Sequence, residues 1–115
     1  MMSKKAKLLE IVKEGYPDFN AETDNFEIEF EGGGDNFGSF YGIGIYRSGD
    51  YQFKFEGELD MDKHNDFLFE ILDESGCGYN WNNAGTTGRI KYNEDDERTL
   101  EVETIVSDEY YGEVE

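Results

Sequence analysis

The residues best suited to catalysis or metal binding cluster between positions 60 and 66. Asp60 begins this stretch, two further aspartates follow it, and His64 is the only histidine of the chain. Alternating carboxylates are typical of calcium loops, but an EF-hand counted from Asp60 needs Gly at its sixth position and Glu at its twelfth. This chain has Asn65 and Ile71 there. We therefore interpret the stretch as the polar start of a helix and predict no metal site.

Nucleophilic catalysis also finds little support. Cys77 is the only cysteine and has glycine on both sides, so no neighbouring cation activates its thiol. The 28 Asp and Glu residues supply carboxylate pairs everywhere, so no single pair is diagnostic of a glycosidase. We expect a non-enzymatic protein with no catalytic residue and no cofactor. A lone cysteine excludes an internal disulfide and is typical of a reducing compartment, so we expect a cytoplasmic location.

A glycine-rich segment, Gly32–Gly34, followed by Asp35 and later by Gly38, superficially resembles a phosphate loop. Its spacing matches neither the dinucleotide-binding glycines nor a P-loop, which ends in a lysine beside a hydroxyl residue. The acidic side chains around it would repel a phosphate group. We predict a hairpin turn, because glycines tolerate the backbone conformations that such turns require.

Charge is distributed unevenly along this chain of net charge −18: all but two of its 28 acidic residues follow position 15, whereas four of its ten Lys and Arg residues precede it. Because nucleic-acid-binding proteins carry basic patches, we expect a basic protein as partner and no direct contact with nucleic acid. No segment has the ~20 apolar residues of a membrane span, so we expect no membrane contact. The N-terminus lacks the apolar run of a secretory signal.

Aromatic residues indicate a folded domain despite a mean hydropathy of −0.78. Nine Phe, eight Tyr and one Trp are too many for a disordered acidic segment. Residues 26–31 alternate Phe or Ile with Glu, which predicts a strand with one buried face and one carboxylate-lined face. The length of the chain fits one domain.

Two further strands are predicted, Ser39–Tyr46 and Tyr51–Glu56, which would complete an antiparallel meander. In the first, alternation assigns Tyr41, Ile43 and Ile45 to one face. It assigns Phe40, Gly42, Gly44 and Tyr46 to the other, where the two glycines leave room for a ligand. In the second strand, the inward residues are Tyr51, Phe53 and Phe55.

Two helices complete the pattern, Lys4–Glu14 and about Met61–Glu74. Ser3 and Asp60 are suitable N-caps, and Gly15 follows the last turn of the first helix. The lysines near the first helix start oppose its dipole, so we expect attraction to the acidic body to hold them. The apolar stripes of the two helices comprise Leu8, Ile11 and Val12, and His64, Phe67, Leu68, Ile71 and Leu72.

Two strands close the chain, about Thr87–Asn93 and Arg98–Val106, with a polar turn at Glu94–Glu97 between them. We expect Leu100, Val102, Thr104 and Val106 to face inward. The predicted fold is therefore α+β, with an antiparallel sheet of about five strands, two helices on one face, and the order α-β-β-β-α-β-β. Residues 1–106 form the domain, and the acidic residues 107–115 a loose tail.

The loop from Tyr79 to Gly85 is the most unusual local sequence, since Trp81 stands among Asn80, Asn82 and Asn83. A Trp flanked by adaptable amides is typical of a recognition surface. The alternative is a structural role, in which Trp81 packs against the edge of the sheet and the asparagines form turns.

Two motifs, the segment from Gly32 to Gly38 and the Trp81-x-Asn83-x-Gly85-x-x-Gly88 run, resemble a family of small, uncharacterised bacterial and phage domains. In these, a strand ends in a Gly-Asp loop, a helix follows, and a Trp/Asn/Gly loop leads into a closing hairpin. The likeness covers about residues 26–106, and the extra glycines around 37–44 depart from it. It implies the same α+β order and no activity, and it fits a phage or mobile-element origin, where small acidic proteins inhibit host machinery.

We therefore expect a non-enzymatic acidic protein that inhibits a basic nucleic-acid-binding host defence protein, such as a nuclease, by DNA mimicry or surface blocking. Glutamates at alternate strand positions repeat at about 6.7 Å, about twice the per-strand charge spacing of DNA. The alternatives are an antitoxin-like or immunity-like module that binds through the Trp81 loop, and a small-ligand-binding domain. The expected acidic surface comprises Glu27, Glu29, Glu31, Asp35, Glu94, Asp95, Asp96, Glu97, Glu101 and Glu103; the expected loop surface comprises Tyr79, Asn80, Trp81, Asn82 and Asn83.

Overall fold

The computed structural model describes residues 3–33, 36–75, 86–93, 98–104 and 110–114. Within them the chain is an α+β protein with two helices and an antiparallel sheet, which confirms the predicted class. The elements are α1 (Lys4–Gly15), β1 (Asp24–Gly33), β2 (Asn36–Arg47), α2 (Asn65–Ser75), β3 (Thr86–Tyr92), β4 (Leu100–Thr104) and β5 (Tyr110–Val114). Their order is α-β-β-α-β-β-β, so the predicted order is wrong at its third strand and at its C-terminal end.

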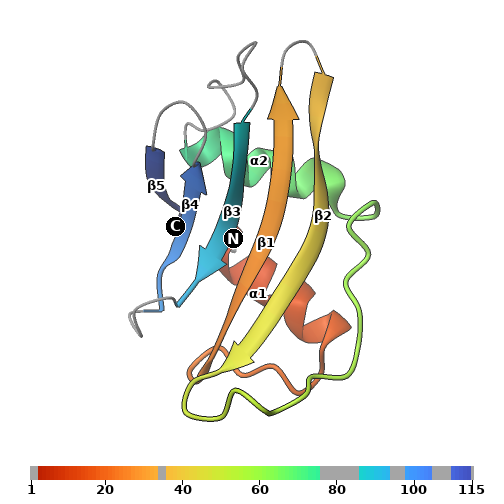
Figure 1. The fold of residues 1–115 in the computed structure, drawn as a ribbon, viewed down its shortest axis with the longest axis vertical. Helices are drawn as coiled ribbons and strands as arrows, with labels where there is room; N and C mark the ends of the chain where they lie inside the picture. Colours follow the sequence, from red (N-terminus) through yellow and green to blue (C-terminus); the bar gives the residue numbers. More distant parts are fainter. Residues whose placement is uncertain (1–2, 34–35, 76–85, 94–97, 105–109, 115) are drawn as a thin grey trace.

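The strands of the described residues form one sheet in the order β2-β1-β3-β4-β5. β1 connects the N-terminal hairpin to the C-terminal strands, because it pairs with β2 on one side and β3 on the other. Figure 1 shows both helices behind the same face of the sheet. The fold therefore has two layers, and in the described part of the chain no helix or strand covers the other face of the sheet, which we call the open face.

The alternation at residues 26–31 predicts β1 correctly. Phe26, Ile28 and Phe30 are at most 1% exposed, and Ile28 lies directly opposite the buried Ile90 of β3. Complete burial of an apolar side chain of this size stabilises the folded state by about 1.5–3 kcal/mol. The same alternation turns the intervening glutamates to the open face.

α1 begins and ends close to its predicted limits. The Ser3 side chain accepts a hydrogen bond from the Ala6 N–H at 3.1 Å, as expected of an N-cap. Its apolar stripe, Leu8, Ile11 and Val12, is buried. At the other end, a side chain on Gly15 would clash with the backbone of Glu58.

β2 contains an irregularity that the sequence pattern does not reveal. Glu29 lies opposite Gly42 and Phe30 opposite Phe40, so Tyr41 is an extra residue in β2. Such a bulge reverses the alternation on one side of it. Phe40 is therefore buried on the core face, where its ring centroid lies 5.1 Å from that of Phe69. Its predicted place on the face of the two glycines is wrong.

The predicted third strand, Tyr51–Glu56, is also wrong, because the chain leaves the sheet after a turn at Arg47. Tyr51 is 78% exposed instead of buried. Phe53 and Phe55 pack edge to face, with ring centroids 4.8 Å apart, and the Arg47 guanidinium lies 3.9 Å from the Phe53 ring. The alternating aromatics therefore pack around one cation rather than into the core.

α2 starts later than predicted. Asp60 caps a turn rather than the helix, since its side chain accepts a hydrogen bond from the Lys63 N–H at 3.1 Å, and the helix begins only at Asn65. His64 is half-buried at this boundary. The predicted apolar stripe of the helix is buried at Phe67, Leu68, Ile71 and Leu72.

The expected loose tail is wrong for Tyr110–Val114, which forms β5 and pairs antiparallel with β4. Val114 lies opposite Leu100, and both side chains are buried in the core. β4 would otherwise be an edge strand, and its unpaired backbone groups favour the addition of another strand. Leu100 and Val102 face inward as predicted.

Candidate functional site

The open face is the candidate site, because it carries the acidic strand positions predicted from the sequence. β1 contributes Glu27, Glu29 and Glu31, of which the last two are exposed. β4 contributes Glu101 and Glu103, both half-buried. Other predicted site residues lie outside the described residues: Asp35, Glu94–Glu97 and the loop Tyr79–Asn83.

Two basic side chains on β3 lie between the acidic strands β1 and β4. The sequence analysis did not predict this basic column. β3 lies between β1 and β4 and places Arg89 opposite Glu29 and Glu103, and Lys91 opposite Glu27 and Glu101. The signal was present in the alternation of Arg89, Ile90 and Lys91, but the strand order was needed to see which columns become neighbours. The open face is therefore acidic, basic and acidic in succession.

Two ion pairs join these columns. Lys91 Nζ lies 2.7 Å from Glu103 Oε2, and the two side chains are only 6% and 17% exposed. Arg89 Nη1 lies 3.7 Å from Glu27 Oε1, with both side chains about a third exposed. Exposed pairs of the second kind contribute about 0–1 kcal/mol. Lys91 is buried and so requires a nearby carboxylate to compensate for its lost hydration.

Glu29 and Glu31 differ from the other acids of this face. Both side chains are exposed, and within the described residues neither forms an ion pair. They lie towards the end of β1 that leads into the hairpin with β2. They are therefore the carboxylates of the open face best placed to meet a cation from outside.

The two glycines of β2 lie on the open face beside these glutamates, Gly42 opposite Glu29 and Gly44 opposite Glu27. A Cβ built on Gly42 meets no atom within 4 Å. At Gly44 the space is occupied, since the Tyr46 hydroxyl lies 2.7 Å from the same position. The predicted room for a ligand is thus reduced to a gap over Gly42.

A small cavity lies next to Tyr46 on the same face. Its volume is about 30 Å³, and it is lined by Asn25, Phe26, Glu27, Tyr46, Lys91 and Tyr92. One molecule in liquid water occupies about the same volume, whereas small-molecule sites have volumes of about 300–1,000 Å³. The buried Asn25 Oδ1 has no hydrogen-bond partner. The cavity is suited to a water, not to a metabolite.

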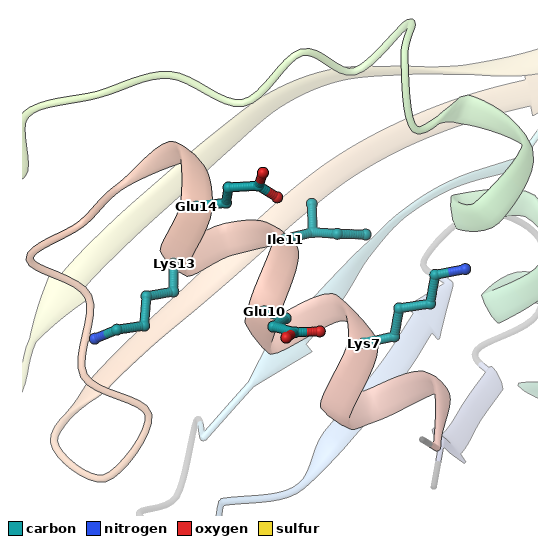
Figure 2. A pocket seen from close by; sticks show the side chains of 5 residues that line it. All are labelled: Lys7, Glu10, Ile11, Lys13 and Glu14. Carbon is teal, nitrogen blue, oxygen red and sulfur yellow. The ribbon is translucent and has the colours of Figure 1, made fainter. Parts of the chain in front are cut away.

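A second hollow lies beside α1, with a volume of about 470 Å³ (Figure 2). Among the described residues, those that line it all come from this one helix: Lys7, Glu10, Ile11, Lys13 and Glu14. In Figure 2 their side chains diverge rather than converge on one point. The hollow therefore offers no set of groups arranged around a ligand.

The lysines of α1 contact groups other than the acidic body expected to attract them. Lys5 Nζ donates to the Arg98 carbonyl oxygen at 3.4 Å, and Lys13 Nζ donates to that of Phe19 at 3.1 Å. Lys7 Nζ lies 4.6 Å from the centre of the Phe67 ring. Carbonyl oxygens and an aromatic face thus hold these cations.

A buried carboxylate that the sequence did not single out lies at the edge of the sheet. Asp24 is fully buried and accepts hydrogen bonds from Arg47 Nε at 2.8 Å and Arg47 Nη2 at 3.1 Å. The Asn20 N–H also donates to it, at 2.8 Å. Burial alone raises the pKa of Asp24, but the hydrogen bonds from Arg47 and Asn20 and the charge of Arg47 outweigh it and lower the pKa. The cluster is structural, because Arg47 already occupies the carboxylate.

Within the described residues, no group of three or more His, Cys, Asp and Glu side chains is arranged to hold a metal ion. In the same part of the chain, neither helix has the length and apolar composition needed to cross a membrane. No protein-family model, curated protein or solved structure matches this chain.

Proposed function

We propose that this chain is a non-enzymatic acidic protein that binds a basic protein through the open face. The supporting observation is the pair Glu29 and Glu31, exposed and without an ion pair in the described residues, on a sheet face that no described element covers. Exposed charges of one sign accelerate encounter with an oppositely charged surface and favour complementary partners. The partner class is a nuclease or another nucleic-acid-binding protein, whose basic groove this face would block.

Surface blocking fits the geometry better than DNA mimicry. Mimicry needs an unbroken row of negative charges at the spacing of a phosphate backbone. Here Arg89 partly neutralises Glu27, and Lys91 pairs with Glu103, in the middle of the face. Among the described side chains of this face, Glu29 and Glu31 are the exposed carboxylates that form no ion pair with another described residue.

The origin and the biological target are part of the same proposal. The likeness of the glycine and Trp81 loops to small bacterial and phage domains supports a phage or mobile-element protein that acts on a host defence protein. Such a role needs only a stable, strongly acidic surface and no catalytic group.

Displacement of nucleic acid tests the proposal. The chain would be used to capture a partner from host lysate at about 50 mM and about 200 mM salt, and then titrated into that partner bound to labelled DNA. We expect capture to weaken steeply at the higher salt, and the chain to release the DNA, since both compete for one basic surface. A captured partner that keeps its DNA would contradict blocking. Loss of capture on Trp81→Ala, with Glu29→Gln and Glu31→Gln without effect, would favour the loop module.

A further inference from the structure

The free edge of β2 is the feature that carries a further inference. Among the described residues, β2 pairs with β1 alone, and its one further backbone hydrogen bond runs from the Asp50 N–H to the Arg47 carbonyl oxygen, at 3.0 Å. The chain then passes β2 on its way to α2 (Figure 1). The Glu58 N–H donates to the Gly15 carbonyl oxygen at 3.1 Å, which attaches this connection to the end of α1. Within the described residues, no backbone hydrogen bond joins the connection to residues 42–46 of β2.

The usable part of this edge runs from Gly42 to Tyr46, because the Arg47 carbonyl oxygen already accepts a hydrogen bond from the Asp50 N–H. Over these residues the register with β1 is regular, because the bulge at Tyr41 precedes Gly42. Natural edge strands are commonly protected by charged side chains or proline. β2 contains no proline and none of the 28 acidic residues, and its one charged residue is Arg47. Nothing in its own sequence from Gly42 to Tyr46 therefore opposes pairing with another strand.

Charge selects the occupant of the edge. A second copy would bring together two chains of net charge −18, which repel each other. An added strand would lie about 10 Å from β1, two strand spacings away, and alternate side chains would point to the open face. Where such a side chain lies over Gly42, the space is empty, and the exposed Glu29 stands directly beyond it. A long cationic side chain fits this gap.

We propose that the Gly42–Tyr46 edge accepts an extended segment of the basic partner as a sixth strand, with Lys or Arg at alternate positions, one of which contacts Glu29 across Gly42. Strand addition supplies affinity through backbone hydrogen bonds and specificity through alternate side chains. This inference rests on the proposed function, because it states how the basic partner is held.

The test uses a short synthetic peptide of alternating Thr and Lys, the same peptide with alternate amides N-methylated, and a peptide of equal composition with its lysines contiguous. We expect the alternating peptide to bind the full chain and to slow hydrogen exchange at alternate amides from Gly42 to Tyr46. N-methylation on the pairing edge should weaken binding at least about tenfold, because several backbone hydrogen bonds are lost together. The contiguous peptide should bind more weakly than the alternating one.

Variants of the chain locate the contact. Gly42→Leu should weaken binding of the alternating peptide about fivefold or more, because the leucine side chain fills the space over this position. Gly42→Ala should leave most of the affinity. Glu29→Gln should weaken it severalfold, and the charge-matched Glu70→Gln on α2, exposed on the other layer, should not. Circular dichroism checks that each variant is folded.

The contradicting results differ for the two proposals. If all three peptides bind equally well and Glu29→Gln weakens them, the open face binds cations but strand addition is wrong. If none of the three binds even at low salt, strand addition is wrong. The proposed function fails as well if the chain also releases no DNA from a captured partner. If the β2 amides are already protected in the chain alone and the protection depends on protein concentration, a second copy occupies the edge and the inference is overturned.

Discussion

At the scale of single residues, Asp24 is the most constrained charge of the described chain. Its carboxylate receives both the Arg47 guanidinium and the Asn20 N–H, and its backbone carbonyl oxygen accepts a hydrogen bond from Asn93 Nδ2 at 3.3 Å. It therefore ties the start of β1 to the end of β2, to the preceding turn and to the residue that follows β3. The sequence contained a hint, since Asp24 and Arg47 are opposite charges at the open end of one hairpin.

Substitution of Asp24 should reveal this role. Asp24→Asn keeps the shape but removes the charge that Arg47 and Asn20 bind, so we expect the free energy of unfolding to fall by about 2 kcal/mol. Urea denaturation followed by circular dichroism measures it. Glu22→Gln, at an exposed position two residues earlier, is the control and should change stability by less than about 0.5 kcal/mol. Equal losses in the two variants would contradict the assigned role.

Comparison of the wild-type protein with Asp24→Asn also gives a prediction about pH. Folding lowers the pKa of Asp24 below its ordinary value of 3.8, so its stabilisation is present above that value and is lost as pH falls through the folded pKa. The difference in unfolding free energy between wild type and Asp24→Asn should be constant from about pH 7 to pH 5 and should shrink below about pH 4. Because both proteins share every other carboxylate, the difference isolates Asp24. A difference that grows on acidification would contradict the direction of the shift.

At the scale of elements, two segments exchange the roles that the sequence suggests for them. Residues 51–56 alternate like a strand but lie outside the sheet, while β5 comes from the segment expected to be a tail. Val114 is 1% exposed and Tyr51 78% exposed. The C-terminal strand is therefore part of the folded core.

Paired substitutions distinguish the two segments. Val114→Ala removes buried methyl groups and should lower the free energy of unfolding by about 1–2 kcal/mol, whereas Tyr51→Ala should change it by less than about 0.5 kcal/mol. Thermal or urea unfolding provides the measurement. A larger loss at Tyr51 than at Val114 would show that residues 51–56, not β5, pack on the core.

The difference between the predicted and observed elements has a physical origin. The alternation of residues 26–31 was sufficient to predict β1 and its buried face, because one face of this strand is wholly apolar and the other wholly acidic. The bulge at Tyr41 was not visible, since a bulge is defined by the register of a partner strand. Likewise, the acids of β1 and β4 were predicted, but the cations of β3 between them depend on strand order, which no local pattern encodes.

At the scale of the whole molecule, a net charge of −18 opposes compaction. Salt should therefore stabilise the fold: we expect the free energy of unfolding to rise as sodium chloride increases from about 10 mM to about 300 mM, because the Debye length shortens from about 30 Å to well under 10 Å. Thermal unfolding at each concentration measures this. Since the Lys91–Glu103 pair is buried, screening should weaken it less than it weakens the repulsion. A midpoint that falls steadily with salt would contradict this balance.

The open face is the site on which this molecule-wide charge can act on a partner. Glu29 and Glu31 lie on it, whereas Glu10 and Glu14, which are also exposed, belong to α1, the helix behind the sheet (Figure 1). Replacing either pair of glutamates by glutamine changes the net charge by the same amount. The two double variants therefore differ only in where on the molecule the charge is removed.

The most direct test of the proposed function is the affinity of the captured basic partner for two double variants, Glu29→Gln with Glu31→Gln and Glu10→Gln with Glu14→Gln, titrated over a range of salt concentrations. We predict that the first weakens binding by at least about tenfold at low salt and flattens its salt dependence, while the second changes affinity by less than about threefold. Equal effects of the two double variants would contradict the claim that the open face holds the partner.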